Sequence, residues 1–186
     1  MSRHNHYPDV AIKLGSAERP KLLLIDNISA KADAEKVAHL QQAFKDMLRE
    51  AIAQYPEYDI LVKTELPKTR YLSLNVLAHL PHVYFIDFNI HTRSLLDIAE
   101  KVFVVNAAEG FEALLLGKEV HCYGKPFYAG WGLTTDHVVI PERTAKRSVK
   151  EVFHFAYLVN SRYYLPTEDR ACELEELVDY MLGTGS

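Results

Sequence analysis

Two kinds of hydrophobic pattern alternate along this chain. Short unbroken apolar runs, such as Leu22 to Ile25, have the length and composition of strands buried on both faces of a parallel sheet. Longer segments repeat apolar residues at intervals of three and four, which is the period of an amphipathic helix. The predicted strands are 21–25, 58–63, 83–87 and 101–105, and the predicted helices are 33–54, with Asp33 as its N-cap, and 92–99.

The alternation continues through the middle of the chain. An apolar run ends at Asn106, a short helix begins around residues 109–112, and a further strand ends near Tyr123. A loop dense in glycine and aromatic residues follows. We predict a last short strand at 138–140. The pattern over residues 70–81 is ambiguous, and a short helix is one interpretation of it.

Helix signals dominate the C-terminal part of the sequence. Ser148 with Glu151 three residues later is a capping-box pattern, which predicts a helix start. Thr167 is a second candidate cap, for an amphipathic terminal helix that includes Cys172 and ends at Gly183.

Strands that alternate with helices predict an α/β fold in which helices cover both faces of a mainly parallel sheet. We therefore expect an irregular lead-in over 1–19 and a single Rossmann-like, three-layer domain over 20–186. No GxGxxG sequence follows the first strand, so a nicotinamide or flavin cofactor is disfavoured and no cofactor is expected.

Composition narrows the class of protein further. The net charge of −4 argues against non-specific binding of nucleic acid, which needs an excess of Lys and Arg on one face. No apolar stretch approaches the roughly eighteen residues that cross a bilayer, so we expect a soluble, cytoplasmic protein. Cys122 and Cys172 lack metal-type spacing and are expected to be free thiols. The nine histidines show no metal-ligand spacing either, so no metal site is predicted.

A candidate site lies where the predicted strands end, because open α/β sheets bind ligands at the carboxyl ends of their strands. Gly110 stands where a strand turns into a helix, and a helix start offers N–H groups to an anion. The loop 124–132 holds the only Trp of the chain, Trp131, among three glycines. Together with Lys63 these groups suit a nucleotide: cations and N–H groups for phosphate, carboxylates for ribose, and aromatic surface for the base.

A purely structural role is the alternative to ligand binding for the same residues. Phe111 has the spacing of a core residue beneath the leucines of its own helix. Glu112 suits the first turn of a helix as a solvated acid, which stabilises the helix by only about 0.3–1 kcal/mol. The Trp131 loop also fits a purely structural role.

The stretch GFEALLLGKEVHCYGKPFYAGWGLTTD, residues 110–136, resembles the signature of capsule polysaccharide synthesis proteins of the KpsC and KpsS type, which are bacterial β-Kdo glycosyltransferases. The segments 110–114, 117–118 and 126–134 follow the family's order and spacing. Weaker likeness runs from Leu22 to about Pro166.

The resemblance implies one half of a GT-B glycosyltransferase, namely the C-terminal half that binds the sugar nucleotide CMP-Kdo or CMP. It implies a role in capsular polysaccharide biosynthesis or export. No metal is expected, and an N-terminal half or a partner subunit would supply the acceptor site. Work on a lipid acceptor would place the protein at the cytoplasmic face of the inner membrane as a peripheral protein. The implied nucleotide-binding residues are Lys63, Asn106, Glu109, Gly110, Phe111, Glu112, Tyr123, Gly124, Pro126, Phe127, Tyr128 and Trp131.

Two departures from the family pattern bear on activity. The Lys-x-His-Pro of the family is replaced by Lys63-Thr64-Glu65-Leu66-Pro67, and the Ser-Gln before Gly-Phe-Glu is replaced by Asn106-Ala107-Ala108-Glu109. An acid that faces a phosphate weakens binding, because the two charges repel. Three hypotheses stay open: the donor half of a transferase that is incomplete alone, a nucleotide-binding module without catalysis, and a scaffold protein in capsule assembly.

Overall fold

The computed structural model describes residues 14–26, 34–64, 80–86 and 90–183. The chain forms two compact units, residues 7–146 and residues 147–186 with 1–6. The prediction of one domain over 20–186 stays a prediction. The cap at Asp33, the short helix within 70–81 and the departure at Glu65 lie outside the described residues.

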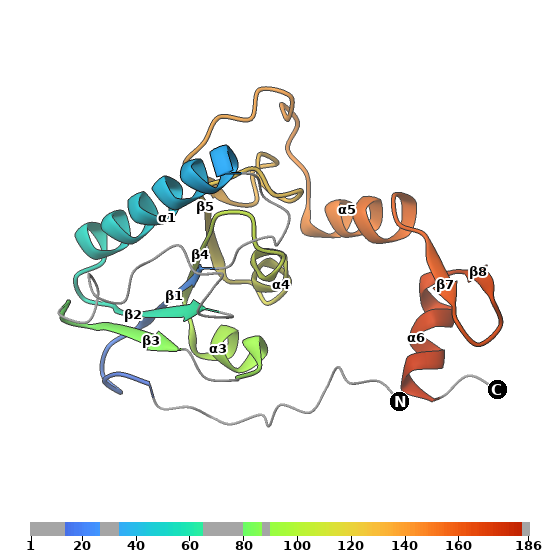
Figure 1. Ribbon diagram of the computed structural model, residues 1–186, viewed down its shortest axis with the longest axis horizontal. Coiled ribbons are helices and arrows are strands. Elements are labelled where there is room, and N and C mark those ends of the chain that lie inside the picture. The colour runs from blue at the N-terminus through green and yellow to red at the C-terminus, as the bar shows by residue number, and fades with distance from the viewer. Residues whose placement is uncertain (1–13, 27–33, 65–79, 87–89, 184–186) are drawn as a thin grey trace. The chain divides into compact units, whose positions relative to one another are not determined.

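A six-stranded sheet organises the larger unit (Figure 1). All neighbouring strands are parallel, in the order β3-β2-β1-β4-β5-β6. The predicted Rossmann-like α/β fold is confirmed. The strands are β1 (Lys21–Asp26), β2 (Asp59–Thr64), β3 (Val83–Ile86), β4 (Lys101–Val104), β5 (Glu119–Cys122) and β6 (Thr135–Asp136).

The chain builds this sheet outward from its centre in both directions. From β1 it proceeds to β2 and β3 on one side, and then returns to place β4, β5 and β6 on the other side. The strand order therefore reverses between β1 and β4. In open parallel sheets the crevice outside the carboxyl ends at this reversal is where ligands bind.

Helices cover the sheet because successive strand residues point to opposite faces. On one face Leu22, Leu24 and Phe103 pack with Phe44 and Met47 of α1 (Ala34–Gln54). The opposite face is covered by α3 (Thr92–Ile98) and α4 (Glu109–Leu115), as Figure 1 shows. The predicted strands and helices up to residue 123 are confirmed to within one or two residues.

The predicted strand at 138–140 is wrong, since the last strand is formed by Thr135 and Asp136 beside β5. The Asp136 carboxylate accepts hydrogen bonds from the Gly130 N–H (2.9 Å) and the Thr134 hydroxyl (2.7 Å). These bonds fix the shape of the loop before the strand, and the His137 N–H donates to the Cys122 carbonyl of β5 at 2.9 Å. Val139, by contrast, is 82% exposed.

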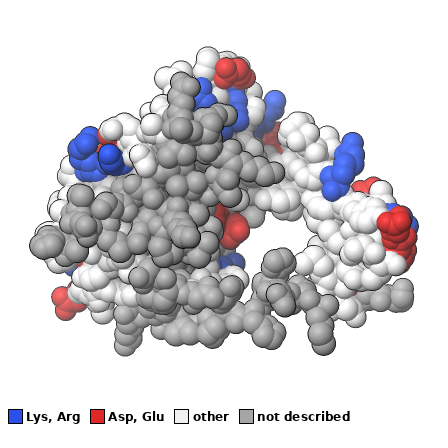
Figure 2. Space-filling model, in the orientation of Figure 1, with Lys and Arg blue, Asp and Glu red and all other residues white. Residues whose placement is uncertain are grey.

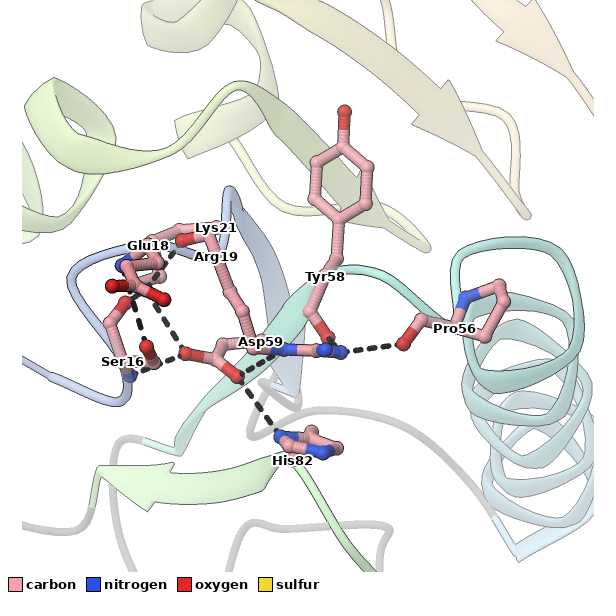
Figure 3. A network of polar contacts seen from close by, with 8 residues as sticks. All are labelled: Ser16, Glu18, Arg19, Lys21, Pro56, Tyr58, Asp59 and His82. Atoms are coloured by element: carbon pink, nitrogen blue, oxygen red, sulfur yellow. Dashed lines mark hydrogen bonds and ion pairs between the residues drawn. The ribbon is translucent and has the colours of Figure 1, made fainter.

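A buried carboxylate ties the start of the sheet together (Figure 3). Asp59, at the start of β2, is fully buried and accepts bonds from the Ser16 N–H (2.7 Å), Lys21 Nζ (2.9 Å) and Arg19 Nε (3.0 Å). Burial raises the pKa of Asp59, but the bonds from Lys21 and Ser16 outweigh it, so that the net shift is downward. This network lies at the amino ends of β1 and β2, at the edge opposite the candidate site.

The smaller unit consists of helices and one hairpin. The predicted capping box is confirmed, because Ser148 and Glu151 bond reciprocally at the start of α5 (Val149–Phe153). The helix continues as η1 (His154–Val159), a π-helix. The strands β7 (Tyr163–Leu165) and β8 (Arg170–Cys172) pair antiparallel.

The prediction that Thr167 caps a helix containing Cys172 is wrong. Asp169 adopts φ +54° in the turn of the hairpin, and Cys172 lies in β8. The terminal helix α6 (Leu174–Leu182) begins after Glu173 and ends, as predicted, at Gly183, which takes φ +70°. Both cysteines are free thiols, as predicted.

Candidate functional site

The candidate site is built from the two loops that follow β4 and β5. These strands are neighbours, and β4 borders the strand-order reversal. Asn106 follows β4 and is exposed, and its side-chain Oδ1 accepts a hydrogen bond (2.9 Å) from the Lys125 N–H in the loop after β5. Gly124 lies against this side chain: a Cβ there would stand 2.9 Å from Asn106 Cγ and closer still to the Val105 carbonyl. The two loops therefore approach so closely that only glycine fits at 124.

Tyr128 anchors the long loop from inside. Its side chain is fully buried, and its hydroxyl donates a hydrogen bond to the carbonyl of Ala107, directly before α4. Burial raises the pKa of the Tyr128 phenol above its ordinary value, so the group stays a neutral donor. A Cβ at Gly110 would overlap the hydroxyl and lie 2.8 Å from Cζ. Gly110 is thus required for the close approach of the loop to α4.

Aromatic rings join α4 to the same loop. Phe111 is 1% exposed, with its ring centroid 5.0 Å from that of Phe127 and 5.8 Å from that of Tyr128. The structural explanation therefore accounts for the Phe111 side chain, which belongs to the core. Phe127 is 39% exposed, so one aromatic face of this group reaches the surface. Pro126 is buried beside it.

Two carboxylates lie on the first turn of α4. Glu112 is exposed, and within the described part of the chain it makes no hydrogen bond or ion pair. Glu109 is half-buried. The N–H groups of Gly110 and Phe111 already donate to the carbonyls of Ala107 and Ala108, at 3.3 and 2.9 Å. The polar groups that face solvent here and could bond to a ligand are therefore mainly the side chains of Asn106 and Glu112.

The outer side of the loop is fastened by residues that the sequence did not single out. Arg143 Nη1 donates to the carbonyls of Pro126 and Ala129, the latter at 2.7 Å. Its guanidinium carbon lies 5.5 Å from the centroid of the Trp131 ring. The Trp131 Nε1–H donates to the Phe127 carbonyl at 2.8 Å. No sequence signal marks Arg143, because its partners are main-chain groups that every residue carries.

Lys63 and Tyr123 lie apart from this group. Lys63, 9% exposed near the end of β2, is separated from β4 by β1, which places the two strands about 10 Å apart. Tyr123 is 7% exposed and its ring packs in the core beneath α1. The structure therefore brings together ten of the twelve predicted residues, and these are Asn106, Glu109, Gly110, Phe111, Glu112, Gly124, Pro126, Phe127, Tyr128 and Trp131.

The Tyr123 ring belongs to a row of stacked aromatic side chains beneath α1, together with His137 and His121. Its ring stacks on His137 at 4.0 Å, and His121 Nδ1 lies 3.1 Å from His137 Nε2. Burial lowers the pKa of His121, although the hydrogen bond from its Nε2 to Glu119 (2.8 Å) opposes the shift. Burial likewise raises the pKa of the Tyr123 phenol. The buried rings thus favour neutral forms, which suits a core position.

A hollow of about 580 Å³ lies at the amino ends of the strands, lined by residues 14–21 with Ile98 and Glu100. Its two basic side chains, Arg19 and Lys21, are both bonded to Asp59. Both cations are engaged by this carboxylate, and Glu18 and Glu100 line the same hollow, so it is a weaker candidate for an anionic ligand than the opposite edge.

Charged side chains of both signs lie on the surface of the described residues (Figure 2). On the face drawn in Figure 2, Lys and Arg side chains of the described residues lie in small separate groups with Asp and Glu among them. Nothing in the described ranges forms a helix long and apolar enough to cross a membrane.

Comparison with known proteins bears on the same stretch of chain. Residues 36–164 match a family model described as capsule polysaccharide biosynthesis protein. The chain is 33% identical over 193 residues to the capsule polysaccharide modification protein LipA of Neisseria meningitidis serogroup B. It is 27% identical over 184 residues to the lipopolysaccharide-processing protein LpsZ of Rhizobium meliloti.

Among solved structures, the chain is similar to the β-Kdo 2,4 transferase of KpsC from Thermosulfurimonas dismutans, with a TM-score of 0.77 and 29% identity over 92% of this chain. The β-Kdo 2,7 transferase of the same KpsC shares the fold, with a TM-score of 0.72 and 24% identity. The chain spans 27% of the length of LipA, 41% of LpsZ and 54% of the KpsC 2,4 transferase structure.

Proposed function

The chain belongs to the capsule polysaccharide biosynthesis family, and we propose that it is the half of a β-Kdo glycosyltransferase that binds the donor CMP-Kdo. The part of the KpsC transferase structure that it matches is about half of that chain, which is what one Rossmann-like half of a GT-B enzyme would occupy. In this proposal the other half, as a further segment or a partner subunit, provides the acceptor site.

One observation carries the proposal. The stretch 110–136, whose sequence resembles the family signature, begins on the first turn of α4 and includes the loop after β5, both at the carboxyl edge of the sheet beside the reversal of strand order. Ligands of open α/β sheets bind at this edge. The loop there is rigidly held by Tyr128, Gly110 and Gly124. A rigid wall needs little ordering when a ligand binds, so more of the interaction energy appears as affinity.

The exposed side chains suggest a division of roles. The Glu112 side chain makes no hydrogen bond or ion pair within the described residues and can accept hydrogen bonds from ribose hydroxyls. In this proposal Asn106 and the exposed part of Phe127 contact the base. Lys63, which lies beyond β1 in the sheet, is the residue that we propose for a phosphate contact.

A second candidate is a nucleotide-binding module without catalysis. Its support is the Ala107-Ala108 pair, which offers no side-chain donor where the family resemblance leads one to expect Ser-Gln. The Ala107 carbonyl is moreover committed to Tyr128. The two candidates share the donor site, and release of Kdo from CMP-Kdo, with and without the other half, separates them.

Calorimetric titration with CMP tests the donor site. We expect binding at millimolar CMP or below, weaker binding of UMP, and a loss of at least tenfold in CMP affinity in Glu112→Ala, which is about 1.4 kcal/mol. The matched control is Glu57→Ala, which removes an exposed carboxylate from the opposite edge of the sheet. No heat at millimolar CMP, or an equal loss in Glu57→Ala, would overturn the proposal.

A further inference from the structure

We infer that Arg143 is a positioning residue of the proposed nucleotide site, because it holds the loop 124–132 in the conformation that presents Trp131 and Phe127. The inference rests on the proposed function. It concerns a residue outside the signature stretch, which none of the sequence patterns marks.

Arg143 acts on the loop first through the main chain. Its Nη1 donates to both the Pro126 and the Ala129 carbonyls. The Ala129 N–H also donates to the Pro126 carbonyl at 3.1 Å, so these residues form a tight turn. A single guanidinium nitrogen therefore bridges the two carbonyls of that turn and fixes its shape.

The same side chain also packs against the end of the loop. The guanidinium lies 5.5 Å from the Trp131 ring centroid, in range of a cation–π interaction. Gly130 takes φ +79°, and a Cβ there would stand 3.1 Å from both Cβ and Cδ of Arg143. The loop and the Arg143 stem thus approach as closely as a glycine permits. Movement of either would move Trp131.

Two side chains hold the loop, Tyr128 from the core and Arg143 from the outside, and they differ in burial. Tyr128 holds it to Ala107 from the core and is inaccessible to a ligand. Arg143 is half-buried, and the described residues place no carboxylate within 4 Å of it, whereas Arg19 has one and Arg170 has two. Both of its bonds leave from Nη1, so its planar guanidinium can lie beside the Trp131 ring at the same time, a shape that a lysine ammonium does not reproduce. Loss of Arg143 should free the outer turn while the core anchor remains.

The sole tryptophan allows a direct test. Arg143→Ala and Arg143→Lys are compared with the wild-type chain and with a control, Arg49→Ala, which removes an exposed arginine of α1. Three quantities are measured: the Tm, acrylamide quenching of Trp131 fluorescence without ligand, and CMP affinity by calorimetry. We expect Arg143→Ala to increase the quenching constant at least twofold and to weaken CMP binding at least tenfold. Arg143→Lys should stay within about threefold of Arg143→Ala in affinity, and Arg49→Ala should match the wild type.

The outcomes separate the inference from the function beneath it. Wild-type chain that binds no CMP refutes the proposed function, and the inference falls with it. Wild-type binding with unchanged affinity in Arg143→Ala refutes the inference alone. Full recovery of affinity in Arg143→Lys also refutes it, since charge rather than the planar guanidinium would then be responsible. Should Arg143→Ala fail to fold, Arg143→Lys is judged against the wild type by the same tenfold criterion.

Discussion

Substitution of Gly110 by alanine tests how tightly α4 and the site loop are packed. The new Cβ would overlap the Tyr128 hydroxyl and lie 2.8 Å from Cζ of a side chain that is itself fully buried. Overpacking of this kind costs about 1–3 kcal/mol. Displacement of the hydroxyl from the Ala107 carbonyl adds about 1–3 kcal/mol for buried polar groups left unpaired. The better helix propensity of alanine offsets about 1 kcal/mol.

We therefore expect Gly110→Ala to lower the free energy of unfolding by about 3 kcal/mol, measured by urea denaturation with an unchanged m-value. The corresponding fall in Tm is about 6–12 °C. A double-mutant cycle with Tyr128→Phe provides the control. Removal of the hydroxyl relieves the closest overlap, so the two changes together should cost at least about 1 kcal/mol less than their sum. A Gly110→Ala chain as stable as the wild type, or strict additivity in the cycle, would refute the close packing described.

Further predictions concern the opposite edge of the sheet and the buried histidine. Asp59→Asn should cost about 2–4 kcal/mol in urea unfolding, because Arg19 and Lys21 lose their buried partner; a cost below 0.5 kcal/mol would contradict the network. Because burial lowers the pKa of His121 below its ordinary value of 6.5, its contribution to stability is complete above pH 6.5 and declines as the pH falls below it. The Tm should therefore be lower at pH 5.5 than at pH 7.5, with a smaller difference in His121→Gln; a Tm that rises on acidification would be inconsistent with this assignment. The lowered pKa values of Asp59 and Glu119 predict a second loss of stability below about pH 4, visible as an acid unfolding transition.

The sheet was predicted well from the sequence because central parallel strands produce a recognisable hydrophobic pattern. Buried on both faces, β1 reads as an unbroken apolar run, and the helix α1 shows its period through the residues that cover the sheet. The capping box at Ser148 was equally readable, since both of its bonds are made by side chains three residues apart.

Elements that depend on distant partners could not be predicted in this way. The edge strand at Thr135–Asp136 has two exposed residues, and it depends on pairing with β5 and on local bonds from Gly130 and Thr134 to Asp136. The hairpin of β7 and β8 depends on the left-handed conformation of Asp169, which no sequence pattern predicted. Periodicity alone favoured a helix in that place.

The site was predictable only in part, for the same reason. Glycine positions such as 110 and 124 were visible as signals of close approach, and the structure identifies what approaches them. The role of Arg143 was invisible, because its partners are carbonyls. Tyr123 was expected at the ligand, but it lies directly after β5 with its ring in the core under α1. Side-chain direction follows from strand register, which sequence spacing does not fix for a residue at the end of a strand.

The most direct test of the central claim is a titration of the ¹⁵N-labelled chain with CMP, followed by amide and indole NMR shifts. The account predicts that the shifts concentrate at residues 106–112 and 124–131, including the Trp131 indole, at the carboxyl edge of the sheet. Amides around Ser16 and Asp59, at the opposite edge, should stay in place. Shifts that concentrate at the amino edge, or none at millimolar CMP, would contradict the assignment of this chain as a donor-binding half.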